Sequence, residues 1–158
     1  MGLVSSRIQH VYQLLDPGQH DELSQFDAAF RQDNTVYRVL STDDPSFFHG
    51  RSVIFNRATR LHTDNRDPKP NLTPVLTLGT YETGTMSLPT LNMRFPYNPG
   101  TLAMVRGAII PHEVSFDGGQ RVAIAHFMHQ TILSGASRPL VPQFRPYARP
   151  EPTSRGRA

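Results

Sequence analysis

Apolar residues near the start of the chain recur with the spacing of amphipathic helices. Over residues 5–15, one helical face carries Ile8, Val11, Leu14 and Leu15. The run Asp16-Pro17-Gly18 predicts the end of this helix. A second helix is predicted over residues 21–31, and its apolar side consists of Leu23, Phe26 and Phe30.

Further along the chain, the pattern changes to short segments that suit β-strands and are separated by turn residues. The segments are residues 36–40, 52–56, 61–64, 72–80, 86–88, 93–95, 101–106, 109–114 and 121–129. Gly and Pro number 11 and 14, more than a helical bundle tolerates. Two helices followed by eight or nine strands predict an α+β fold, in which the helices cover one face of a β-sandwich or barrel.

The basic charge of the chain is concentrated at its C-terminal end. The whole sequence has 16 Lys and Arg against 13 Asp and Glu, a net charge of +3. Residues 134–158 contain five Arg and one Glu, or +4, so residues 1–133 sum to −1. We therefore expect one folded domain over residues 1–133, followed by a Pro- and Arg-rich disordered tail over residues 134–158. The net charge by itself does not indicate a nucleic-acid surface on the folded part.

Several classes of protein are excluded or disfavoured by composition. The chain has no Cys, so thiol catalysis and a disulfide-linked secreted scaffold are excluded. The sequence contains no apolar run of about 18 residues, so no membrane span is predicted. The first residues do not have the pattern of a signal peptide. We expect an intracellular protein, in the nucleus or cytoplasm, without an obligate protein partner.

The segment His62-Thr63-Asp64 is the first candidate for chemistry. On a strand, residues i and i+2 point to the same face, so the imidazole and the carboxylate would enter one cavity together. Two of the three protein ligands of a non-haem iron site can come from such a pair. The three-residue pattern is short enough to occur by chance, so it needs support from other positions.

That support comes from His112 and Arg121. His112 follows Ile109-Ile110-Pro111 at the predicted end of an apolar strand, and Arg121 opens the last strand. On that strand Arg121 shares one face with Ala123, Ala125 and Phe127. The small alanines leave room for a ligand beside a guanidinium, which suits the far carboxylate of a dicarboxylate.

Together these residues predict a site for Fe(II) and 2-oxoglutarate. Two His and one carboxylate occupy one face of the metal and leave three positions open for a keto acid and dioxygen. The alternative is that His62 and His112 are ordinary, partly buried histidines and that Arg121 is a surface ion-pair partner. His126 and His129 are three residues apart on a predicted strand and face opposite sides, so we expect His129 near the cavity and His126 beneath the helices.

Several motifs follow one another between residues 50 and 130. They are Leu61-His62-Thr63-Asp64-Asn65-Arg66-Asp67, Thr77-Leu78-Gly79-Thr80-Tyr81, Arg94-Phe95-Pro96-Tyr97-Asn98-Pro99-Gly100, His112-Glu113-Val114 and Gly119-Gln120-Arg121. In this order they resemble the 2-oxoglutarate/Fe(II)-dependent dioxygenase superfamily, above all its TET/JBP-like branch and the related small oxygenase domains of fungal genomes.

The resemblance implies a fold, a ligand set and a reaction. The fold would be a double-stranded β-helix, of jelly-roll or cupin type, with the N-terminal helices packed on one sheet. His62, Asp64 and His112 would bind iron and Arg121 would anchor 2-oxoglutarate. Hydroxylation of a C–H bond would release succinate and CO₂. Family members often carry Ser two residues after the anchoring Arg, whereas this chain has Ala123. Arg60 and Asn56 are candidates to bind the other carboxylate of 2-oxoglutarate.

The substrate stays open at the level of sequence. The TET/JBP resemblance implies oxidation of the methyl group of 5-methylcytosine or thymine, for which the base must leave the DNA stack. A protein side chain or a small molecule is an alternative substrate. A catalytically inactive β-helix that serves as a binding module is a further alternative.

Overall fold

The computed structural model describes residues 2–135, whereas Met1 and residues 136–158 lie outside the described part. Its helices are α1 (Gly2–Leu15), α2 (Pro17–Asp33), α3 (Thr35–Asp43), the 3₁₀ turn η1 (Pro89–Leu91) and α4 (Gln130–Gly135). Its strands are β1 (Gly50–Phe55), β2 (Thr59–His62), β3 (Thr73–Gly79), β4 (Thr83–Leu88), β5 (Met93–Pro96), β6 (Leu102–Val105), β7 (His112–Asp117) and β8 (Arg121–Phe127).

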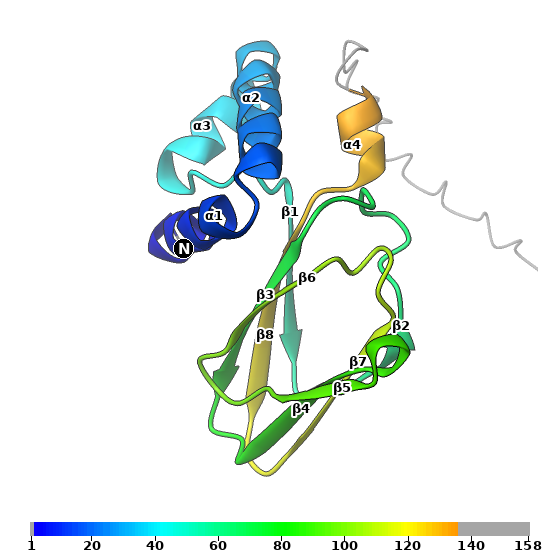
Figure 1. Ribbon diagram of the computed structural model, residues 1–158. Coiled ribbons are helices and arrows are strands. Elements are labelled where there is room, and N and C mark those ends of the chain that lie inside the picture. The colour runs from blue at the N-terminus through cyan, green and yellow to red at the C-terminus, as the bar shows by residue number, and fades with distance from the viewer. Residues whose placement is uncertain (1, 136–158) are drawn as a thin grey trace, which may run out of the picture.

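The strands form two four-stranded sheets with wholly antiparallel pairing, in the orders β1-β8-β3-β6 and β2-β7-β4-β5. Helices α1, α2 and α3 gather at one end of the strands (Figure 1). The predicted α+β fold with a jelly-roll core is confirmed.

Strand β8 lies between β1 and β3 and determines which side chains face inward. Ser52 of β1 and Val75 of β3 are both paired with Ala125, so the three side chains share one face of the sheet. Arg121, Ala123, Ala125 and Phe127 line the cavity between the sheets, as the alternation along this segment predicts.

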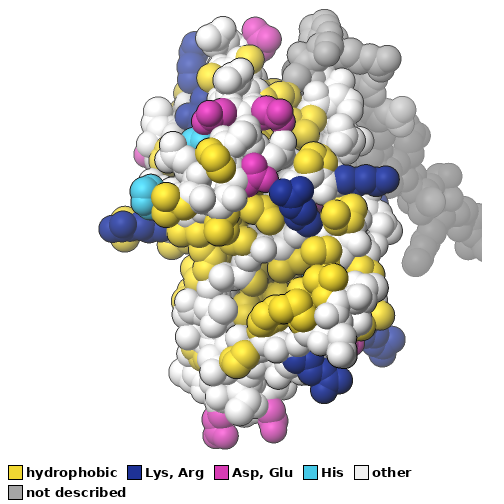
Figure 2. All heavy atoms as spheres, in the orientation of Figure 1, with side chains coloured by type: hydrophobic (Ala, Val, Ile, Leu, Met, Phe, Trp, Pro, Cys, Tyr) yellow, Lys and Arg dark blue, Asp and Glu magenta, His cyan; other side chains and the backbone are white. Residues whose placement is uncertain are grey.

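The N-terminal helices pack on the sheet that contains β8. Ile8, Tyr12 and Leu23 form an apolar core with Phe47, Phe48 and Met128, flanked by Leu102 and Met104 of β6. Below the helices, hydrophobic side chains reach the surface over the strands (Figure 2). The helices therefore cover only part of the sandwich. Within residues 2–135, no helix has the length and apolarity that crossing a bilayer requires.

One predicted strand is a helix. Residues 36–40 were expected to be extended, but they lie inside α3. The side chain of Asn34 accepts a hydrogen bond from the backbone N–H of Tyr37 at 2.9 Å and caps the helix. The Tyr37 ring packs against His49, with ring centroids 4.4 Å apart. Capping and tertiary packing thus overrule the β-propensity of Val36 and Val39.

The expected tail falls mostly outside the described residues. The predicted boundary between residues 133 and 134 lies within α4, and Ile132 and Leu133 of this helix pack against the apolar core. The prediction for residues 136–158 stays a prediction.

Candidate metal centre and co-substrate pocket

A cavity of about 550 Å³ lies between the two sheets. Side chains from both sheets line it, including Val75 and Ala123 from one sheet and Met86 and Val114 from the other. His62, Asp64, His112 and Arg121 also line it. Four residues from three separate parts of the sequence therefore line one cavity, as the sequence predicts.

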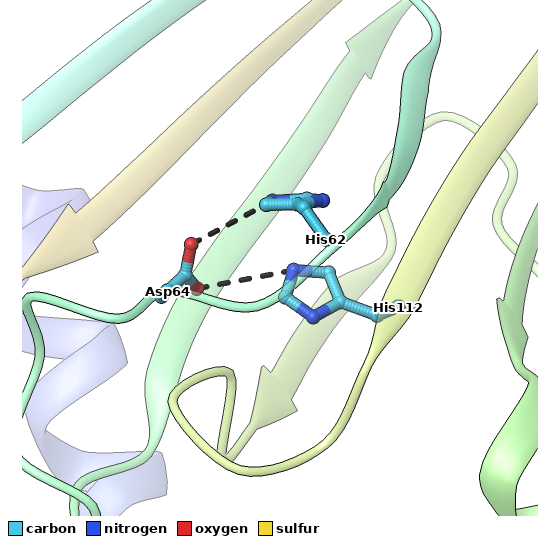
Figure 3. Close-up of side chains that lie close together, drawn as sticks. All are labelled: His62, Asp64 and His112. Carbon is cyan, nitrogen blue, oxygen red and sulfur yellow. Dashed lines mark ion pairs between the residues drawn. The ribbon is translucent and has the colours of Figure 1, made fainter.

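His62, Asp64 and His112 form a compact cluster of possible metal ligands. One ligand atom from each lies within 4.8 Å of the other two. The carboxylate of Asp64 points between the imidazoles (Figure 3), with Oδ1 3.6 Å from His62 Nε2 and Oδ2 3.8 Å from His112 Nε2. Two neutral imidazoles and a carboxylate are the donor set of a non-haem Fe(II) site with open positions.

Strand pairing and backbone carbonyls orient the two imidazoles. His62 ends β2 and is paired with His112, which begins β7. The Nδ1 atom of each ring lies 2.9 Å from the carbonyl oxygen two residues earlier, that of Arg60 or Ile110. An Nδ1–H donated to these carbonyls leaves the Nε2 lone pair of each ring for a metal.

The structure differs from the predicted geometry of the site in two details. Asp64 does not lie on the same strand as His62, because β2 ends at His62. A loop brings Asp64 into place instead, and its backbone N–H donates to the carbonyl of Gly107 at 2.9 Å. His112 begins its strand rather than ending one, since residues 109 and 110 form a turn before Pro111, which has no N–H to donate to a sheet.

Arg121 reaches the same cavity with a buried guanidinium. The residue is only 2% exposed, and its guanidinium carbon lies 5.4 Å from the centre of the Tyr97 ring and 5.7 Å from that of Phe116. Its NH1 donates to the carbonyl of Arg57 at 3.1 Å, whereas its buried Nε has no partner in the protein. A buried guanidinium with spare donors fits a carboxylate ligand.

Comparison with protein families shows the family to which the chain belongs. Residues 1–130 match the family model Tet_JBP, described as the oxygenase domain of the 2OGFeDO superfamily. The chain belongs to the TET/JBP family. It is accordingly a 2-oxoglutarate-dependent non-haem iron dioxygenase, and its cofactor and co-substrate are Fe(II) and 2-oxoglutarate.

A solved structure shares the fold of this TET/JBP domain. The structure of NgTET1 in complex with 5mC DNA aligns with a TM-score of 0.66 and 16% sequence identity, over 82% of this chain. The aligned part is 48% of the NgTET1 chain, so this chain spans about half of that structure. The search of curated proteins finds no match.

Arg60 and Asn56, the sequence candidates for the other carboxylate of 2-oxoglutarate, are not among the residues that line the cavity of the TET/JBP domain. Asn56 has a left-handed backbone with φ of 46°, and it pairs with the backbone of Arg121. Its Oδ1 accepts the Arg121 N–H at 2.8 Å and its own N–H donates to the Arg121 carbonyl at 2.8 Å. Asn56 therefore fixes the start of β8. The exposed Arg60 contributes its carbonyl to His62.

Asp67 and His129 are cavity residues that sequence reasoning did not assign a role, although His129 was expected on this side. Asp67 is 8% exposed, and its Oδ2 accepts a hydrogen bond from Thr73 Oγ1 at 3.1 Å. Its Oδ1 lies 3.2 Å from Nδ1 of His129. Burial raises the pKa of Asp67, and the hydrogen bond from Thr73 and the neighbouring His129 oppose that shift. The sequence feature that could have indicated Asp67 is its position three residues after the candidate ligand Asp64.

His126 lies on the opposite face of β8, beneath the helices, as expected. It is 1% exposed, and its Nε2 accepts a hydrogen bond from Nε of Arg51 at 3.0 Å. The same guanidinium binds Asp44 and, at 2.8 Å, the hydroxyl of Ser5. Burial, with the charge of Arg51 added, lowers the pKa of His126 to about 4. His126 thus joins the helices to the sheet and is no candidate metal ligand.

Proposed function

We propose that this domain oxidises the methyl group of 5-methylcytosine in DNA. In this proposal His62, Asp64 and His112 hold Fe(II), and Arg121 binds the far carboxylate of 2-oxoglutarate. The observation that carries the choice of substrate is the buried carboxylate of Asp67, which shares the cavity and the loop of the candidate ligand Asp64.

The chemistry of the cofactors balances with this substrate. Fe(II) with 2-oxoglutarate and dioxygen supplies oxidative decarboxylation coupled to hydroxylation, so that a methyl group becomes a hydroxymethyl group and succinate and CO₂ leave. The residues of the chain contribute binding and orientation. The two imidazoles, oriented by backbone carbonyls, present Nε2 to the cavity, and Arg121, whose guanidinium lies beside the rings of Tyr97 and Phe116, offers hydrogen-bond donors.

We infer that Asp67 reads the edge of a flipped base. In 5-methylcytosine the exocyclic amine and the methyl group occupy neighbouring ring positions, so a base whose amine is held near Asp67 turns its methyl toward the adjacent ligands. A carboxylate accepts a hydrogen bond from the cytosine N4 amine. Thymine has a carbonyl oxygen at that position, which a carboxylate repels. The site therefore favours 5-methylcytosine over thymine.

His129 and Phe127, which line the same cavity, support this proposal. The imidazole of His129 lies beside Asp67, and its ring centroid is 4.8 Å from that of Phe127. A carboxylate, an imidazole and an aromatic face are the groups that bind the pairing edge and the plane of a base taken out of the stack. NgTET1, which shares the fold, is described in complex with 5mC DNA. With DNA as substrate, we propose that the enzyme acts in the nucleus or the cytoplasm.

The test is turnover on oligonucleotides that differ at one base. The Fe(II)-loaded protein is incubated with 2-oxoglutarate and duplexes that contain 5-methylcytosine, cytosine or thymine at one position, and the bases are analysed by mass spectrometry. We expect 5-hydroxymethylcytosine from the first duplex only. Succinate formation that no duplex stimulates would reject a DNA substrate and favour a protein side chain or a small molecule.

A variant separates reading of the base from the iron chemistry. Asp67→Asn replaces one acceptor by an amide donor and should lower 5-methylcytosine turnover by roughly 10- to 100-fold, because an interaction with the base edge contributes about 1–3 kcal/mol. Slow 2-oxoglutarate decarboxylation without DNA should persist in this variant. If turnover on 5-methylcytosine were unchanged, Asp67 would not read the base.

A further inference from the structure

Gly107, in the turn between β6 and β7, packs directly against the candidate iron ligands. A Cβ atom built on Gly107 would lie 2.1 Å from Oδ2 of Asp64 and 3.1 Å from its Cγ. It would also lie 3.3 Å from Cε1 of His112. Ordinary van der Waals contact begins near 3.4 Å, so any side chain larger than hydrogen would force Oδ2 of Asp64 to move by more than an ångström.

The backbone at Gly107 does not itself demand glycine. The glycines with positive φ in the described chain are Gly79, Gly100, Gly118 and Gly119, where an L side chain would be strained. Gly107 is not among them. The hydrogen at this position is therefore required by its neighbours, which are Asp64 and His112, and not by the conformation of the chain.

The same turn holds both ligands through its carbonyl groups. The Gly107 carbonyl accepts the backbone N–H of Asp64 at 2.9 Å, and the Ile110 carbonyl lies 2.9 Å from Nδ1 of His112. The N–H groups of Ile109 and Ile110 both donate to the Arg106 carbonyl at 3.0 Å and close the turn. Arg106 also binds Asp16 between α1 and α2, at 2.8 Å. The position of this turn is therefore fixed from both sides.

We propose that Gly107 is a positioning residue for the iron site, which rests on the proposed ligand set of His62, Asp64 and His112. Its missing side chain leaves the space in which the Asp64 carboxylate faces both imidazoles. In metal-free protein a methyl group at position 107 can be accommodated, because the end of the Asp64 side chain can rotate away. Metal binding requires the carboxylate back in that space. The cost of the methyl group therefore falls on metal affinity and not on folding.

The test measures metal binding directly. The metal-free wild type and Gly107→Ala are titrated with Co(II), followed by its visible absorption and by calorimetry, and thermal melting is recorded without metal. Metal–ligand distances tolerate only about 0.2 Å of error, and loss of a group that orients a ligand typically costs roughly 10- to 100-fold in metal affinity. We expect a weakening of that size in Gly107→Ala, an altered Co(II) spectrum, and unchanged melting of the metal-free protein.

Two control variants separate an effect of Gly107 on Asp64 from a general effect of an added methyl group. Gly135→Ala adds the same methyl group where nothing lies within 4 Å and should change neither quantity. In an Asp64→Ala background the space is vacated, so Gly107→Ala should cause no further loss of Co(II) affinity. Equal Co(II) affinity of wild type and Gly107→Ala would overturn the proposal. Destabilisation or failure to fold in both backgrounds would also overturn it, because Gly107 would then serve folding.

The proposed metal site is tested separately by His112→Ala. If this variant bound Co(II) like the wild type, the ligand set itself would be wrong. If His112→Ala lost Co(II) and Gly107→Ala did not weaken binding, only the role of Gly107 would be rejected.

Discussion

Replacing Arg121 by Lys tests whether the buried guanidinium binds 2-oxoglutarate. The substitution retains a positive charge but removes the planar fork that forms two parallel hydrogen bonds with a carboxylate. The site should be sensitive to this change, because Arg121 is 2% exposed and its Nε is buried without a protein partner.

The magnitude follows from the bond that is lost. A hydrogen bond to a charged group contributes about 1.5–3 kcal/mol. Since each 1.4 kcal/mol is a factor of ten, losing one such bond should weaken 2-oxoglutarate binding by roughly 10- to 150-fold. The contact of the cation with Tyr97 and Phe116, whose ring centres lie 5.4 and 5.7 Å from the guanidinium carbon, is present with and without 2-oxoglutarate, so its change should affect the stability of the protein more than this dissociation constant.

The assay is anaerobic titration of the Fe(II)-loaded protein with 2-oxoglutarate, followed by the metal-to-ligand absorption band. Arg57→Lys is the matched control, because the exposed Arg57 offers only its backbone carbonyl to Arg121. We expect the dissociation constant to rise in Arg121→Lys and to stay unchanged in Arg57→Lys. An unchanged constant in Arg121→Lys, with melting preserved, would place the anchor of 2-oxoglutarate elsewhere.

Two further predictions concern the metal and the helices. His112→Ala should abolish Co(II) binding in calorimetry while the metal-free protein melts nearly as before, because only one imidazole at the cavity wall, 12% exposed, is removed. Retained binding would show a different ligand set. His126 has a pKa of about 4 in the folded protein, against 6.5 for an unperturbed histidine. Between these pH values the unfolded chain binds more protons at this residue than the folded chain does. The stability of the protein therefore falls as the pH drops from 6.5 toward 4. The free energy of unfolding of the wild type, measured in urea, should fall by about 2 kcal/mol between pH 7 and 5 through this group. The free energy of unfolding of His126→Gln should fall correspondingly less. Equal decreases would mean that His126 gains its proton without cost in the folded state.

The chemistry of the site could be predicted from residue types and their order. Two histidines, a carboxylate two residues after the first, and an arginine nine residues after the second are local facts of the sequence. Alternation along residues 121–127 also correctly assigned Arg121 and Phe127 to the cavity and His126 to the helices, because a strand has only two faces.

Local pattern failed where tertiary contacts decided the outcome. Residues 36–40 have strong β-propensity, yet the cap by Asn34 and the packing of Tyr37 make them helical. Asn56 has the chemistry of a ligand-binding amide, but its side chain is used on the backbone of Arg121. Asp64 was assigned to the right cluster for the wrong reason, since a loop and not a strand presents it.

The sequence by itself determined the donor set and the face on which each strand residue lies. Only the tertiary structure decided that Gly107 makes room for Asp64 and that Asp67 and His129 meet at the same cavity. The physical reason is that donor type and strand alternation belong to single residues and their neighbours in sequence. The meeting of distant side chains depends on strand register and on turns, and these are set by packing across the whole fold.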